Sequence, residues 1–140
     1  MLIVVDTNIF IGACMGSGAP SKVIASCLQE ENKALMGTTL FSEYEAVINR
    51  DSIFKDCHLS KLEREELLDI FIATTEWTRI FYNWRPNLRD EGDNHLIELA
   101  IAGNAEIIVT RNIRDFSKME LSFPDLKILT PENFIKEYSK

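Results

Sequence analysis

Short runs of apolar, mostly β-branched residues alternate along this sequence with longer segments that have the periodicity of helices. Strands are predicted at residues 2–5, 34–36, 107–109 and 126–129, and an aromatic run predicts a further strand at 77–82. Strands that alternate with helices are joined by right-handed crossovers and form a parallel sheet. The sequence therefore predicts an α/β fold in which helices cover both faces of a central, mainly parallel sheet.

Several of the helices have clear start and stop signals. Ser21 is expected to cap a helix after a loop that contains glycine and proline, and Ser60 with Glu63 has the spacing of a capping box. A buried helix is predicted at 94–102 and is expected to end at Gly103.

The composition is that of a folded protein with its own core. Residues 1–140 are predicted to form a single domain, because 46% of them are hydrophobic and no linker, repeat or low-complexity segment interrupts them. No apolar stretch approaches the roughly 18–20 residues of a membrane span, and the N-terminal apolar run is too short for a signal peptide. Three cysteines without zinc-binding spacing fit the reduced cytoplasm, which is the expected location. The net charge of −7 neither supports nor excludes a nucleic-acid partner, because carboxylates that hold a metal ion would contribute to it.

Acidic residues stand near the ends of the predicted strands. Asp6 comes directly after the first strand, and Glu43 lies in the first turns of the helix that follows the second. Asp90 and Asp93 stand at the start of the helix that precedes the fourth strand, and Asp115 follows that strand. Ligands in open parallel sheets bind at the carboxyl ends of the strands, so one sheet edge can gather all five acids.

Such a set of carboxylates suits Mg²⁺, which prefers about six oxygen ligands and keeps several waters. A bound ion lowers the pKa of a water and neutralises phosphate oxygens, so the set fits cleavage of phosphodiester bonds. Four polar neighbours are candidates for orienting the carboxylates or waters: Thr7, Asn8, Thr110 and Asn112. Taken singly, each acid is also explained as a helix cap, a turn residue or a solvated side chain. The functional prediction rests on their joint placement.

The order of these motifs resembles the PIN-domain family. Residues 4–9, Val-Val-Asp-Thr-Asn-Ile, are similar to the family's opening, where an aspartate after the first strand precedes Thr or Ser and Asn. The helix glutamate and apolar stripe of 42–48 resemble the second acidic element, and 90–100 and 108–116 resemble the third and fourth. The similarity spans nearly the whole chain in the family's order.

This resemblance implies a three-layer α/β/α sandwich and an endoribonuclease that uses Mg²⁺ or Mn²⁺. Short members of this kind resemble VapC-type toxins of toxin–antitoxin pairs. The resemblance therefore implies an RNA substrate, a homodimer and an antitoxin that blocks the site. It also implies cleavage that leaves 5′-phosphate and 3′-hydroxyl ends.

The site residues that the resemblance implies follow the same motifs. Asp6, Glu43 and Asp93 match the family's three main acids, and Asp90 matches an accessory acid. At the fourth position, where many members have an aspartate two residues after the strand-end threonine, this sequence has an asparagine, and Asp115 stands three residues later. Asparagine carries no charge, so one firmly held ion is expected, with a second recruited alongside substrate.

Basic residues near the acids are candidates for contacts with RNA phosphates: Arg111, Arg114 and Lys22. The ordinary explanation for each is a solvated surface residue.

Two other functions remain as alternatives. One is a phosphoryl-transfer protein of the phosphatase or receiver type. A phosphatase of the haloacid dehalogenase type would need a second aspartate two residues after Asp6, where the sequence has Asn8. A receiver domain would need paired acids before its phosphorylated aspartate and a lysine after a later strand, and the sequence has neither arrangement. The other alternative is a catalytically weak or inactive PIN-like domain that binds RNA or protein, which Asn112 favours. Crowded carboxylates argue against that alternative, because like charges cost stability unless a cation offsets them.

Overall fold

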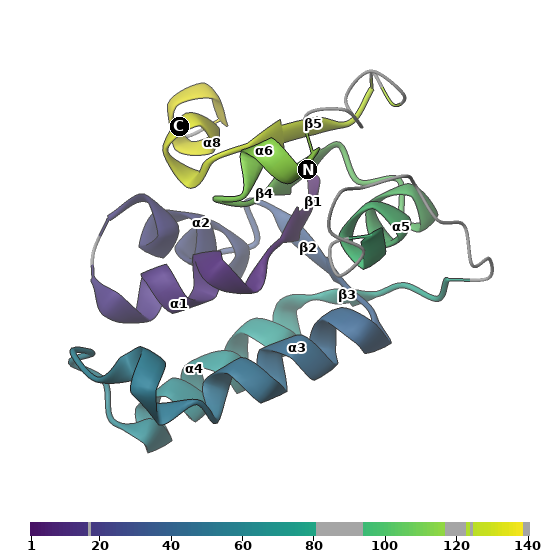
Figure 1. The fold of residues 1–140 in the computed structure, drawn as a ribbon. Helices are drawn as coiled ribbons and strands as arrows, with labels where there is room; N and C mark the ends of the chain where they lie inside the picture. The colour runs from purple at the N-terminus through teal and green to yellow at the C-terminus, as the bar shows by residue number, and fades with distance from the viewer. Residues whose placement is uncertain (17, 81–93, 117–122, 124, 139–140) are drawn as a thin grey trace.

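In the computed structural model, five short strands of the described residues form one parallel sheet, with helices on both faces (Figure 1). The structure describes residues 1–16, 18–80, 94–116, 123 and 125–138, with the side chains of positions 94 and 115 left aside. In chain order the elements are β1 (Leu2–Val5), α1 (Thr7–Met15), α2 (Ala19–Leu28), β2 (Lys33–Met36), α3 (Thr38–Ile48), the 3₁₀ helix η1 (Asp51–Phe54), α4 (Lys61–Thr74), β3 (Glu76–Trp77), α5 (Asn94–Ala102), β4 (Ile107–Val109), α6 (Ile113–Phe116), β5 (Lys127–Leu129) and α8 (Pro131–Tyr138).

The sheet has the strand order β3-β2-β1-β4-β5. The chain winds from β1 outward to β3 and then returns to β4 on the other side of β1, so the direction of winding reverses between β1 and β4. Val5 pairs with Val109 in the register of these two strands, and they therefore end at the same level. Open parallel sheets bind ligands at such a switch point, beyond the carboxyl ends of the strands.

Helices cover the sheet in two layers. Helices α1 and α2 pack against each other, and α2 also packs against α8, whereas α5 packs on β1, β2 and β4. Figure 1 shows α1 and α2 on one side of β1 and α5 on the other. The predicted three-layer α/β/α sandwich with a parallel sheet is thus confirmed.

Three aromatic rings from three different helices pack against one another in the core. The cluster consists of Phe10, Tyr44 and Phe71, and the distances between their ring centroids are 5.8–6.1 Å. All three side chains are at most 1% exposed. Because they belong to α1, α4 and α3, burial of this cluster fixes these helices relative to one another.

Several predicted boundaries are confirmed, and others differ. The helix at 94–102 and the capping box at Ser60 occur as predicted. Helix α2 begins at Ala19, before the predicted cap Ser21, because proline is favoured in a first helical turn, where its missing N–H is not needed. The hydroxyl of Ser21 instead lies within hydrogen-bond reach of two carbonyls, those of Gly16 and Ala13.

The predicted strand at 77–82 is the largest difference. Strand β3 spans only Glu76–Trp77, with one further ladder bond from the amide of Thr78, while positions 81 and 82 lie outside the described residues. In the described part of the chain, no helix is long and apolar enough to cross a membrane. The organisation of residues 1–140 as a single domain stays a prediction.

Candidate active site

Asp6 occupies the switch point of the sheet. Its backbone amide donates to the carbonyl of Val109 at 3.1 Å, which continues the pairing of β1 with β4 by one residue. Its Oδ1 accepts from the amide of Thr7 at 2.7 Å, so Asp6 caps α1. Its Oδ2 accepts from the hydroxyl of Thr110 at 2.8 Å and from the side-chain amide of Asn8 at 3.3 Å. Three donors from two segments therefore hold one carboxylate.

This carboxylate is buried in a way that disfavours its charge. Asp6 is 5% exposed, and burial raises its pKa above the ordinary value of 3.8. The donors Thr110 and Thr7 lower the pKa in part, whereas the charge of Glu43 raises it further. A cation beside Asp6 would offset the cost of burying its negative charge.

The side chain of Glu43, on α3, lies next to that of His95, on α5. Its Oε1 lies 3.1 Å from Nε2 of His95, and the charges of both residues act on the carboxylate of Asp6. The side chain of Glu43 is 41% exposed, whereas that of His95 is 11% exposed. Both ring nitrogens of His95 are buried and have no hydrogen-bond partner among the described residues, so the approach to Glu43 is close but lacks hydrogen-bond geometry.

A buried tyrosine next to Glu43 connects its helix to the end of β1. The hydroxyl of Tyr44 donates to the carbonyl of Val5 at 2.7 Å. Val5 immediately precedes Asp6, so this bond fixes α3, and with it Glu43, at the carboxyl end of β1.

Three further acids were predicted to belong to the site. Asp90 and Asp93 lie outside the described residues, and for Asp115 only the backbone position, in α6, is described. Within the described residues, no three side chains of His, Cys, Asp or Glu converge as a metal site. The chemistry present still fits a divalent ion, because a buried carboxylate, a partly exposed carboxylate and an imidazole with unpartnered nitrogens lie at one sheet edge.

The polar residues predicted to orient the carboxylates make the following contacts. Thr7, Asn8 and Thr110 all donate to Asp6, although Thr7 does so through its backbone. Asn112 contributes its backbone amide, which donates to the hydroxyl of Thr110 at 3.1 Å. Asn112 therefore acts on Asp6 indirectly, through the hydroxyl of Thr110.

His95 is the residue that sequence reasoning missed. The two histidines of the chain, His58 and His95, lack zinc-binding spacing, and neither was predicted as a site residue. The available signal was the position of His95 two residues after Asp93, at the start of a predicted buried helix.

The basic residues predicted to contact RNA have different settings. Arg111 forms a bidentate ion pair with Glu132 of α8, with N–O distances of 2.8 and 2.9 Å, and its backbone amide donates to Oδ1 of Asn8 at 3.4 Å. Arg114 is an exposed residue of α6. Lys22 is exposed on α2 and lines a 220 Å³ hollow between α2 and α8. Arg111 is thus linked to the site through Asn8, which itself donates to Asp6.

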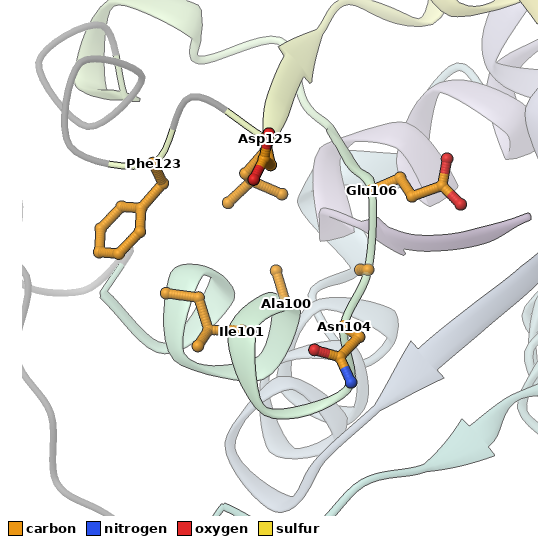
Figure 2. A pocket seen from close by; sticks show the side chains of 8 residues that line it. Ala100, Ile101, Asn104, Glu106, Phe123 and Asp125 are labelled. Carbon is orange, nitrogen blue, oxygen red and sulfur yellow. The ribbon is translucent and has the colours of Figure 1, made fainter.

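A larger pocket lies at the opposite edge of the sheet. It has a volume of about 470 Å³ and is lined by Ala100, Ile101, Asn104, Ala105, Glu106, Phe123, Asp125 and Leu126. Glu106 and Leu126 immediately precede β4 and β5, so the pocket is at the amino ends of the strands. Figure 2 shows the carboxylate of Glu106 pointing away from the space that Phe123 and Ile101 border. This pocket is therefore separate from the site at Asp6.

Comparison with a solved structure supports the fold. The chain resembles VapBC2 from Rickettsia felis, solved bound to a DNA fragment from their promoter, with a TM-score of 0.59. The alignment covers 93% of this chain and 98% of that chain at 18% sequence identity. At this identity the similarity shows a shared fold. No curated protein matches the sequence significantly.

The family is established by the sequence itself. A family model described as PIN domain matches residues 2–114. This span contains Asp6, Glu43 and Thr110, and it includes four of the five strands. The chain therefore belongs to the PIN-domain family.

Proposed function

We propose that this protein is an endoribonuclease that depends on Mg²⁺ or Mn²⁺ and hydrolyses RNA phosphodiester bonds. The observation that carries the proposal is the carboxylate of Asp6, which is 5% exposed at the switch point and is held by three donors. Burying an ionised carboxylate without a cation beside it costs free energy, even when it accepts hydrogen bonds. A bound cation would offset that cost. Membership of the PIN-domain family supports the same chemistry.

In this proposal Asp6 and Glu43 hold the ion, together with the predicted ligands Asp90 and Asp93, and Asp115 is a further catalytic acid. A bound divalent ion would supply an activated water and offset the negative charge of the phosphate. The task of the described residues is positioning. Thr110 and Asn8 keep Asp6 in one orientation, and the bond from Tyr44 to β1 keeps Glu43 at the same level.

We further propose that the protein is the toxin of a toxin–antitoxin pair, acts as a homodimer in the cytoplasm and is blocked by a cognate antitoxin. The support is the family and the similarity of fold to VapBC2 along 93% of the chain. RNA phosphates would meet Arg111, Arg114 and Lys22. Arg111 would have to exchange its partner Glu132 for a phosphate, which a bidentate guanidinium can do because it recognises both groups in the same geometry.

A specific observation favours one alternative, a domain that binds RNA or protein without cutting. The fourth acidic position is Asn112, and it takes part in the site through its backbone amide. Such a domain would bind RNA with no dependence on Mg²⁺ or Mn²⁺.

The test is cleavage of a pool of structured RNAs with Mn²⁺, with Mg²⁺ and with EDTA. We expect cleavage with either ion, no cleavage with EDTA, and a loss on the order of 100-fold or more in Asp6→Asn and Glu43→Gln. Glu45→Gln is the matched control for Glu43→Gln, because Glu45 is an exposed residue of the same helix. Cleavage that persists unchanged in both site variants would refute the proposal, and RNA binding without cleavage would establish the alternative.

A further inference from the structure

His95 has a setting that its structural role alone does not explain. Its side chain is 11% exposed, and both ring nitrogens are buried without a hydrogen-bond partner among the described residues. Buried polar atoms normally have such partners, and leaving them unmade is unfavourable. The nearest polar atom that the structure identifies is Oε1 of Glu43, 3.1 Å from Nε2.

The distance between Oε1 of Glu43 and Nε2 of His95 also matches that between two ligands of one metal ion. Two ligands at neighbouring corners of an octahedral shell, each about 2.1 Å from the ion, are separated by about 3.0 Å. The observed separation of 3.1 Å, without the alignment of a hydrogen bond, matches that spacing. Glu43 and His95 therefore already have the mutual distance of two ligands of one ion.

We propose that Nε2 of His95 is a nitrogen ligand beside Oε1 of Glu43, and that it makes the site prefer Mn²⁺ over Mg²⁺. The inference rests on the proposed function, because it assigns a further ligand to the same metal site. It adds a residue of a different chemical class to a site otherwise predicted from carboxylates.

The preference follows from the chemistry of the donor. Mg²⁺ is a hard ion that takes oxygen ligands and gives up water reluctantly, whereas transition-metal ions accept imidazole nitrogen readily. A carboxylate next to an imidazole therefore discriminates between two ions that carboxylates alone bind similarly. The side chain of Glu43 is 41% exposed, so solvent can supply the remaining positions of the shell.

The experiment uses the intact chain loaded with Mn²⁺ and examined by pulsed electron paramagnetic resonance. Electron spin-echo modulation detects a nitrogen nucleus bound directly to Mn²⁺. The variant is His95→Gln, whose amide can replace the nitrogen with an oxygen ligand. His58→Gln is the matched control, because His58 is the other histidine of the chain and is exposed. Titration calorimetry of each protein with Mn²⁺ and with Mg²⁺ gives the ratio of the two affinities.

We expect nitrogen modulation in the wild type and in His58→Gln, and none in His95→Gln. The preference for Mn²⁺ over Mg²⁺ should fall by on the order of 10-fold in His95→Gln and stay unchanged in His58→Gln. The wild-type spectrum decides the matter even if His95→Gln fails to fold.

Two results would overturn the inference while leaving the proposed function intact. One is Mn²⁺ bound by the wild type without nitrogen modulation. The other is an equal loss of Mn²⁺ and Mg²⁺ affinity in His95→Gln, which would show that His95 acts only by orienting Glu43. Wild type that binds neither ion would refute both proposals. Nitrogen modulation without RNA cleavage would establish the ligand and refute the nuclease.

Discussion

Removing the hydroxyl of Thr110 is the strongest single test of how the site is built, because this hydroxyl joins the end of β4 to the carboxylate of Asp6, which follows β1. It donates to Oδ2 of Asp6 at 2.8 Å and accepts from the amide of Asn112 at 3.1 Å. Thr110→Val keeps the shape of the side chain and removes both bonds. The buried carboxylate then keeps the amide of Thr7 and the weaker contact from Asn8.

The expected loss follows from the charge of the acceptor. A hydrogen bond to an ionised group contributes about 1.5–3 kcal/mol, and water cannot readily replace this one because Thr110 is fully buried and Asp6 is 5% exposed. The bond to Asn112 adds less, since Asn112 is exposed. We expect the free energy of unfolding to fall by about 2 kcal/mol near neutral pH. For a chain of this length, that lowers Tm by roughly 5–8 °C.

The loss should depend on pH with a definite sign. Burial raises the pKa of Asp6 above 3.8 in the folded protein, so the contribution of Asp6 to stability rises as pH falls and its carboxylate takes up a proton. The hydroxyl of Thr110 stabilises the ionised form and lowers this pKa. Asp6 therefore has a higher folded pKa in Thr110→Val than in the wild type, so the cost of the substitution is complete above the pKa in the variant and shrinks as pH drops toward the wild-type pKa.

The measurement is urea and thermal unfolding of metal-free protein between about pH 4 and pH 8, which spans the ordinary range of carboxyl titration and the region above it. Thr74→Val is the control, because the hydroxyl of Thr74 donates to a neutral acceptor, the carbonyl of Phe71, at 2.7 Å. Its cost should be the same at all pH values. A loss in Thr110→Val that is equally independent of pH, or smaller than about 0.5 kcal/mol, would refute the view that Thr110 stabilises a buried charge.

Two further predictions concern residues around the site. Tyr44→Phe removes the buried bond to the carbonyl of Val5 and should cost about 1–1.5 kcal/mol in unfolding experiments. Tyr138→Phe should cost less, because the hydroxyl of Tyr138 only accepts an exposed bond from Nζ of Lys127 at 3.2 Å; equal losses would contradict the anchoring role of Tyr44. Glu132→Gln breaks an exposed ion pair with Arg111 that contributes at most about 1 kcal/mol, so Tm should hardly change. RNA affinity measured by filter binding should rise about 2–3-fold, because Arg111 is released to contact phosphate. No change in RNA affinity would exclude Arg111 as a phosphate contact.

The position of Asp6 could be predicted because it depends on local sequence and on a general rule of topology. A short β-branched run followed by an aspartate gives a buried strand that ends in a carboxylate. The rule for parallel sheets then places that carboxylate at the ligand-binding edge. The strand order, with β1 next to β4, makes Thr110 its neighbour across the switch point.

The pairing of Glu43 with His95 could not be predicted in the same way. It depends on how α3 and α5 pack, and the two residues are far apart in the sequence with no local pattern that connects them. The ion pair of Arg111 with Glu132 has the same character, since it depends on the placement of α8 beside the end of β4. Pairs of this kind come from tertiary packing, which strand and helix periodicity does not encode.

Boundary errors have local physical reasons. The aromatic run after Trp77 has strand composition, yet strand composition measures fit to a half-buried pleated surface and does not by itself provide a partner strand. The end of α5 lies where the sequence predicted it, because the helix ends at Ala102, directly before Gly103. The left-handed conformation that follows is taken by Asn104, with a φ of 57°, and asparagine is one of the few residues besides glycine that adopt it.

The two explanations of Asp6, as a helix cap and as a metal ligand, turn out to be compatible. An ionised carboxylate offers about four lone-pair positions. Oδ1 accepts one bond, from the amide of Thr7, whereas Oδ2 accepts two, from Thr110 and Asn8. The cap therefore occupies one position of Oδ1, and among the described residues the other is available to a cation. Because the cap from Thr7 and the bonds from Thr110 and Asn8 together fix the orientation of that position, they would preorganise Asp6 for an ion at the sheet edge.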